Sequence, residues 1–220
     1  MAKESEMDKQ KLKGVIDSII DATFTRLNNV YKTHREGLIE STSKATSEGS
    51  RLVFPMYGVH RGFETRISEQ ELRFAFVESF NDYCRKEKIN LFYSIETPTK
   101  MRTYSNFTTS PRDDDENGRS AEFDLVIYND ELERVCLIEF KANNADEIDH
   151  KKDFLKLNNI GEGNEDVLRY FIEIVKSYNE GTIDSLNTKL KNNKGIKAIF
   201  RCYALEGKSR GKEKEGEEIS

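Results

Sequence analysis

The sequence has few cysteines and no long apolar run. Its three cysteines, Cys84, Cys136 and Cys202, form no CxxC pair, so neither a disulfide framework nor a zinc site is expected. No apolar stretch approaches the roughly 20 residues that cross a bilayer, and the first residues lack the apolar core of a signal peptide. We therefore expect a cytoplasmic protein with no membrane partner, in which Cys136 and Cys202 are buried thiols.

Common catalytic and recognition motifs are also missing. The chain contains no P-loop, GxGxxG, GxSxG or HExxH motif, and no RNA-recognition signature or zinc finger. The three histidines lack the spacing of metal ligands; they are His34, His60 and His150. The segment Asp113–Gly118 begins like a calcium-binding EF-hand loop, but Ser120 stands where that loop needs an apolar residue, and strand-like sequence follows. We therefore reject a calcium loop.

The composition is that of one highly charged domain. The chain has 220 residues, of which 36% are hydrophobic and 34% charged, and its formal net charge is −5. A chain of this length buries a modest but sufficient core. The negative charge argues against broad, non-specific attraction to nucleic acid, although it is compatible with an acidic metal site.

The chain divides into three parts. We expect a helical arm and linker over residues 1–50, a folded domain over residues 51–206 and a charged, disordered tail over residues 207–220. Residues 6–32 carry apolar positions three and four apart, which predicts an amphipathic helix. Its apolar face either packs on the domain, pairs with a second copy in a homodimer or docks onto a partner protein, and the pattern does not choose among these.

The domain alternates helices and strands. Helices are predicted at 68–88, 146–158, 166–178 and 182–190, and strands at 91–96, 101–107, 121–128, 135–141 and 195–205, with a turn at 129–133 and a polar, acidic loop at 108–119. This order predicts an α/β or α+β fold with a central sheet.

Two of the predicted strands carry charged residues inside apolar runs. Asp124 lies in the first strand, and Glu139, Phe140 and Lys141 end the second. Alternation along a strand places Glu139 and Lys141 on one face, and the neighbouring strand can bring Asp124 to it. Unpaired charges are costly in such strands, which favours a site over a solvated ladder of charges at a sheet edge.

These residue types suit metal-assisted hydrolysis of a phosphodiester. Mg²⁺ prefers oxygen ligands and keeps several waters, so Asp124, Glu139 and the carbonyl of Phe140 are candidate ligands. The cation would acidify a bound water and neutralise charge on the phosphorus. Lys141 would orient or deprotonate that water, or stabilise the transition state electrostatically.

This segment resembles the core of the PD-(D/E)xK nuclease superfamily. Phe123-Asp124 stands at the PD position, with phenylalanine in place of proline, and Glu139-Phe140-Lys141 stands at the (D/E)xK position. The resemblance implies a restriction-endonuclease-like fold, a central mixed sheet flanked by helices, in the order helix, three strands, helix, strand. It also implies a nuclease that uses Mg²⁺ or Mn²⁺ and acts on DNA, and roles in restriction, anti-phage defence or mobile elements are all compatible with it.

The resemblance further implies a glutamate from the first core helix. Glu71 is the candidate for a catalytic and metal-binding role, although Ser68 and Glu71 also have the spacing of a capping box at a helix start. Arg73 follows Glu71 and is a candidate for contact with the substrate backbone.

The helix after the motif supplies two more candidates. Lys152 and Lys156 lie four residues apart, so they share a helix face and could hold the phosphate backbone, although a solvated helix face would give the same pattern. The alternative function is a non-catalytic subunit with the nuclease fold, which assembles with partners through its helical arm.

Overall fold

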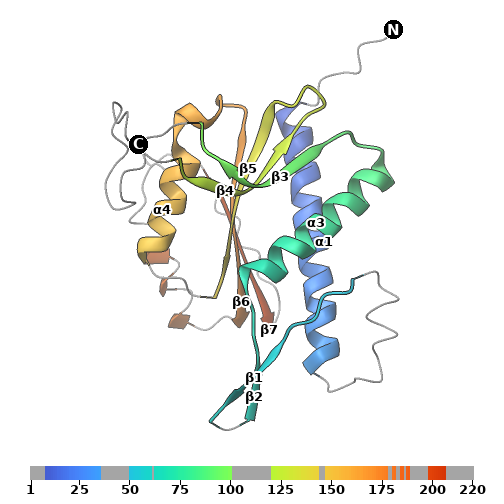
Figure 1. Ribbon diagram of the computed structural model, residues 1–220, viewed down its shortest axis with the longest axis vertical. Helices are drawn as coiled ribbons and strands as arrows, with labels where there is room; N and C mark the ends of the chain where they lie inside the picture. The colour runs from blue at the N-terminus through green and yellow to red at the C-terminus, as the bar shows by residue number, and fades with distance from the viewer. Residues whose placement is uncertain are drawn as a thin grey trace.

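The protein forms a five-stranded sheet with helices on both faces (Figure 1). This computed structural model describes residues 8–35, 50–60, 62–100, 120–143, 147–177 and 198–206, with six further residues between 180 and 188. The elements are α1 (Lys9–Arg35), β1 (Met56–Val59), β2 (Gly62–Thr65), α3 (Glu69–Glu87), β3 (Phe92–Pro98), β4 (Glu122–Tyr128), β5 (Arg134–Ala142), α4 (Glu147–Asn158), the short 3₁₀ helix η2 (Ile160–Glu162), β6 (Leu168–Ser177) and β7 (Ile199–Glu206).

The sheet is mixed, with strand order β3-β4-β5-β6-β7. β3, β4 and β5 are antiparallel neighbours, whereas β5, β6 and β7 run parallel. A short turn over residues 129–133 joins β4 to β5, and α4 crosses over between the parallel strands β5 and β6. The predicted α/β class with a central sheet is confirmed at this level.

Two hydrophobic clusters sandwich the sheet. On one face, α1 and α3 pack over side chains such as Ile138 and Phe140 of β5. On the other, α4 packs over Leu137 of β5 and Phe171 of β6. β5 is therefore covered on both sides, and successive residues along it belong to different clusters.

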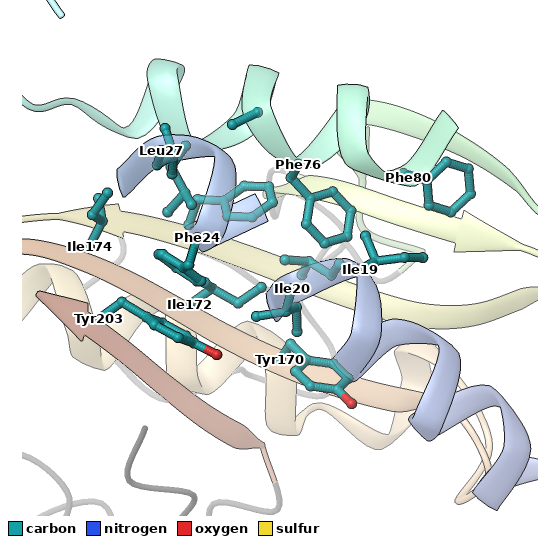
Figure 2. Close-up of a cluster of buried hydrophobic side chains, with 14 of the residues drawn as sticks. Ile19, Ile20, Phe24, Leu27, Phe76, Phe80, Tyr170, Ile172, Ile174 and Tyr203 are labelled. Atoms are coloured by element: carbon teal, nitrogen blue, oxygen red, sulfur yellow. The ribbon is translucent and has the colours of Figure 1, made fainter. Parts of the chain in front are cut away.

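α1 belongs to the core. Asp8 caps its start by accepting a hydrogen bond from the Lys11 amide at 2.7 Å. Ile16, Ile19 and Ile20 are fully buried, and Phe24 stacks on Tyr203 of β7 (Figure 2). Of the three possibilities for this helix, packing on its own domain is the one that the structure shows, so its apolar face is covered.

Polar contacts also tie α1 to the parallel strands. Asp17 accepts a hydrogen bond from the Tyr170 hydroxyl at 2.9 Å and forms an ion pair with Arg201 at 2.8 Å. One turn later, Asp21 accepts a hydrogen bond from Tyr203 at 2.9 Å. Because these contacts lie between a helix and a buried sheet face, they fix the helix orientation as well as its attachment.

The helix predicted at 166–178 is wrong, because this segment is β6. Tyr170, Ile172 and Ile174 face the α1 side, while Phe171 and Val175 face α4. Since both faces are buried, the alternation of polar and apolar residues that identifies a strand is lost. The remaining apolar spacings resemble those of a helix, although the aromatic and β-branched residues favour a strand.

Other predicted elements have varied outcomes. Residues 56–59 and 62–65 form the β1–β2 hairpin, a separate two-stranded sheet that lies below α3 in Figure 1. The helix at 68–88 and the strands at 91–96, 121–128, 135–141 and 195–205 are confirmed as α3, β3, β4, β5 and β7. The predicted linker at 41–49, strand at 101–107, loop at 108–119 and tail at 207–220 lie outside the described residues. The predicted helix at 182–190 is described at four positions only, all helical.

Within the described part of the chain, the structure tests the predictions about the cysteines and about membrane-spanning helices. Cys136 and Cys202 are buried free thiols, as predicted, and Cys84 is a half-buried one. Burial raises the pKa of the Cys84 thiol to about 11. None of the described helices is long and apolar enough to cross a membrane.

Candidate active site

Asp124 and Glu139 lie where β4 and β5 separate. The antiparallel ladder between these strands ends at the pair Leu125–Ile138, and Asp124 and Glu139 are the next residues on each strand. In place of further ladder bonds, the Asp124 carboxylate accepts a hydrogen bond from the Phe140 amide at 2.7 Å. The separation of the strands therefore leaves room for side chains between them.

The three predicted residues lie together at one end of the β4–β5 pair. Glu139 and Lys141 alternate with Phe140, which points into the opposite cluster, so both lie on the same side as Leu137. Asp124 lies beside them at the end of the β4–β5 ladder, where its carboxylate accepts the Phe140 hydrogen bond and pairs with Arg73 of α3. The structure thus brings together the three residues that the motif singled out.

Arg73 of α3 is the direct partner of Asp124. Its guanidinium lies 2.6 Å from one Asp124 carboxylate oxygen and 3.1 Å from the carboxylate of Glu96. Arg73 is buried, and Glu96 is an exposed residue of β3 with a positive φ of 47°. The arginine predicted as a phosphate contact therefore neutralises a candidate metal ligand here.

Lys156 of α4 is the direct partner of Glu139. Its ammonium lies 2.7 Å from a Glu139 oxygen and 3.0 Å from a carboxylate oxygen of Asp153, and it donates to the Glu122 carbonyl at 2.9 Å. The ammonium therefore lies close to three oxygens from three elements of the chain. Lys152, the other predicted lysine of α4, is half-buried one turn earlier.

Asp153 links the two lysines of the site. One of its oxygens lies 2.9 Å from Lys141, whose ammonium also lies 3.5 Å from Glu69 of α3. We call the resulting group the charged cluster. Its members are Glu69, Arg73, Asp124, Glu139, Lys141, Asp153 and Lys156.

Sequence reasoning missed Glu69 and Asp153. Both lie on helices, at positions that look like ordinary solvated acids, and Asp153 becomes 6% exposed only because α4 packs on β5 and β6. A signal was present, since Asp153 is three residues before Lys156 and shares its helix face. That spacing does not reveal that Lys156 pairs with Glu139 on the sheet.

Glu71 lies apart from these contacts in the described structure. Its carboxylate accepts hydrogen bonds from Arg66 at 3.0 Å and from the Ser68 hydroxyl, and its side chain is buried. Ser68 is the N-cap of α3, but its hydroxyl does not cap the helix amides. Because the hydroxyl bonds to Glu71 instead, half of the expected capping box is absent. The predicted catalytic role of Glu71 stays a prediction.

The pKa values of Glu139 and Glu69 are raised. Burial raises the pKa of Glu139 well above its ordinary value, and the charges of Asp153 and Asp124 raise it further, against the opposing effect of Lys156. Burial likewise raises the pKa of Glu69. The influence of Asp124 on both groups indicates that the carboxylates lie close to one another.

The lysines remain charged. Burial alone would lower the pKa of Lys141, but the neighbouring Asp153 carboxylate outweighs it, and the net shift is upward. The pKa of Lys156 is also raised, because Glu139 and Asp153 outweigh its burial. Lys141 is therefore protonated at neutral pH, which disfavours it as a general base in this state.

The pKa of Glu139 predicts a pH-dependent stability difference. A carboxyl whose folded pKa exceeds the unfolded value of 4.5 favours folding below that value, and this contribution is lost as pH rises through the folded pKa. We expect Glu139→Gln, measured by urea unfolding in EDTA, to be more stable than wild type at pH 7. The gap should close near pH 4. A less stable variant at pH 7 would show that the carboxylate is a net stabilising partner of Lys156.

The donor set fits a hard divalent cation. Within the described part of the chain, no three His, Cys, Asp or Glu side chains gather as a metal site. Mg²⁺ commonly uses one or two carboxylates plus waters, so Asp124 and Glu139 meet its requirement. The N–H and C=O of a strand residue point to the same side, so the Phe140 carbonyl also faces Asp124.

His150 and His60 are not members of the charged cluster. His150 is a buried residue of α4 that packs against Phe154 and Phe171, with one nitrogen 3.8 Å from Glu173. His60 is exposed and follows β1. The acidic segment at 113–118 lies outside the described residues. Asp124 itself is a strand residue, which agrees with the rejection of a calcium loop.

No protein-family model, curated protein or solved structure matches the chain.

Proposed function

We propose that this chain is a Mg²⁺-dependent nuclease with a restriction-endonuclease-like core. The observation that carries the proposal is the meeting of Asp124 and Glu139 where β4 and β5 separate, with Lys141 two residues after Glu139 on β5. Two acids and a lysine at one end of a buried sheet are costly to place there and suit phosphodiester hydrolysis. Their position is therefore better accounted for by chemistry than by folding.

The order of the elements supports the same proposal. α3, β3, β4, β5, α4 and β6 follow the order helix, three strands, helix, strand, with the acids on the second and third strands. The final strand of that order is β6, which lies parallel to β5 after the α4 crossover. Two elements lie outside this order. β7 is the edge strand beside β6, and α1 packs against α3.

The chain's residues would divide the chemistry among them. Mg²⁺ held by Asp124, Glu139 and the Phe140 carbonyl would supply a Lewis acid and acidify a bound water. Lys141, which stays protonated, would stabilise negative charge developing on the phosphate instead of accepting a proton. Arg73 and Lys156 are the other buried cations in contact with these acids, and either could bind a phosphate oxygen.

The substrate and biological role rest on the resemblance alone. We propose DNA as the substrate, cleaved in the cytoplasm, with restriction or anti-phage defence as the role. The net charge of −5 implies that binding depends on a local basic surface instead of the whole-molecule field.

A second candidate is a nuclease-fold subunit without catalytic activity. The observation that favours it is the ion pairing of Asp124 with Arg73 and of Glu139 with Lys156, which offsets both negative charges without a metal ion. Assembly through the apolar face of α1 does not support it, because that face is buried in the domain.

A cleavage assay separates the two candidates. The purified chain is incubated with supercoiled plasmid, single-stranded DNA and RNA, in Mg²⁺, Mn²⁺ or EDTA. The nuclease proposal predicts cleavage of at least one substrate with Mg²⁺ or Mn²⁺ and none in EDTA. Intact substrates under all metal conditions, or cleavage that persists in EDTA, would count against it.

A further inference from the structure

The Lys156 ammonium occupies the place beside Glu139 that a metal cation would need. Its ammonium contacts Glu139 at 2.7 Å, the closest ion-pair contact of this carboxylate among the described residues. We propose that Lys156 is the resident counter-ion of the metal-free site, and that it must leave Glu139 before a divalent cation binds there. The inference rests on the proposed function, because it assumes that Glu139 is a metal ligand.

Because Glu139 is buried, a metal cation can bind it only by replacing the Lys156 ammonium. Glu139 is 1% exposed and Lys156 is 9% exposed, so the lysine and α4 together cover the carboxylate. The Asp124 side chain, by contrast, keeps 18% of its surface exposed. A hydrated cation can therefore reach Asp124 directly, but it can reach Glu139 only after the Lys156 ammonium moves away.

The charges of the cluster favour the exchange. Glu69, Asp124, Glu139 and Asp153 contribute four formal negative charges, and Arg73, Lys141 and Lys156 contribute three positive ones. A divalent cation changes the formal charge of the cluster from −1 to +1, and this excess of positive charge repels the nearest ammonium.

Lys156 is suited to move. Its flexible four-carbon stem can carry the ammonium away from Glu139 while it keeps Asp153, one turn before it on α4, as a partner. Once released, the ammonium is available to a substrate phosphate. The two roles of Lys156, as counter-ion and as phosphate ligand, would then alternate with metal binding.

The test measures metal binding without substrate or turnover. Mn²⁺ binding is followed by loss of the free-ion electron paramagnetic resonance signal, for wild type, Lys156→Met and Lys156→Arg. We expect Lys156→Met to bind Mn²⁺ about tenfold more tightly, since it removes one competing charge, and Lys156→Arg to stay near wild type. Lys151→Met, an exposed lysine of the same helix, is the matched control and should not change the affinity.

Each outcome has a distinct meaning. Affinity that is unchanged or weaker in Lys156→Met overturns the counter-ion role, while wild-type binding leaves the proposed function standing. No Mn²⁺ binding by any of the proteins, including wild type, contradicts the metal site and the proposed function together. Lys156→Gln, which is uncharged but retains a hydrogen-bond donor, serves if the methionine variant does not unfold cooperatively, and the same tightening is expected.

Discussion

Replacement of Asp124 by asparagine is expected to reduce Mg²⁺-dependent cleavage by about a thousandfold. Asparagine has nearly the same shape, and its amide oxygen can still accept the hydrogen bond from the Phe140 amide. It lacks the negative charge that would hold the cation, so the loss should appear in kcat rather than in folding. The rate of product formation at saturating Mg²⁺ measures the effect.

Lys151→Met is the control for this variant as well, because Lys151 is an exposed residue of α4 that belongs to no part of the charged cluster. It should retain cleavage within a factor of about two. Thermal unfolding in EDTA should confirm that Asp124→Asn is folded. If the folded asparagine variant kept its activity within tenfold of wild type, Asp124 would not be a ligand of a catalytic metal.

Replacement of Phe24 by alanine is expected to destabilise the whole domain by about 3–5 kcal/mol. Phe24 is 2% exposed, stacks on Tyr203 and lies in the same cluster as Phe76 of α3 and Ile172 of β6 (Figure 2). The variant leaves a cavity at the centre of this cluster, and urea unfolding measures the cost. A single transition at a lower midpoint is predicted, because α1 and the sheet share one core.

Thr25→Ala is the matched control for Phe24→Ala. Thr25 is the next residue of α1, but it is exposed and its hydroxyl bonds only within the helix, to the Asp21 carbonyl. Its replacement should change stability by no more than about 0.5 kcal/mol. Were Phe24→Ala equally mild, α1 would be the detachable arm expected from the sequence and not a part of the core.

Much of the site could be predicted because its position depends on local regularities. Alternation along β5 determines that Glu139 and Lys141 share a face, and the short turn after β4 determines that Asp124 is on the adjacent strand. The helices α1, α3 and α4 could be predicted because each has one buried and one solvated face, which produces a periodic pattern.

The rest depends on tertiary packing, which leaves little trace in the sequence. β6 lost its strand pattern because α1 covers one face and α4 the other. The pairing of Lys156 with Glu139 and of Arg73 with Asp124 depends on how helices from distant segments dock on the sheet. The sequence predicted Arg73 and Lys156 as ligands of the substrate phosphates. In the structure, they form ion pairs with Asp124 and Glu139.

Diffraction from crystals soaked in Mn²⁺, recorded where manganese scatters anomalously, tests the central claim most directly. The account predicts a single strong anomalous peak within bonding distance of both Asp124 and Glu139, about 2.0–2.2 Å from each carboxylate. It also predicts that Lys156 no longer contacts Glu139 in that crystal. An occupied site elsewhere, or no peak while Arg73 and Lys156 still hold the two acids, would contradict it.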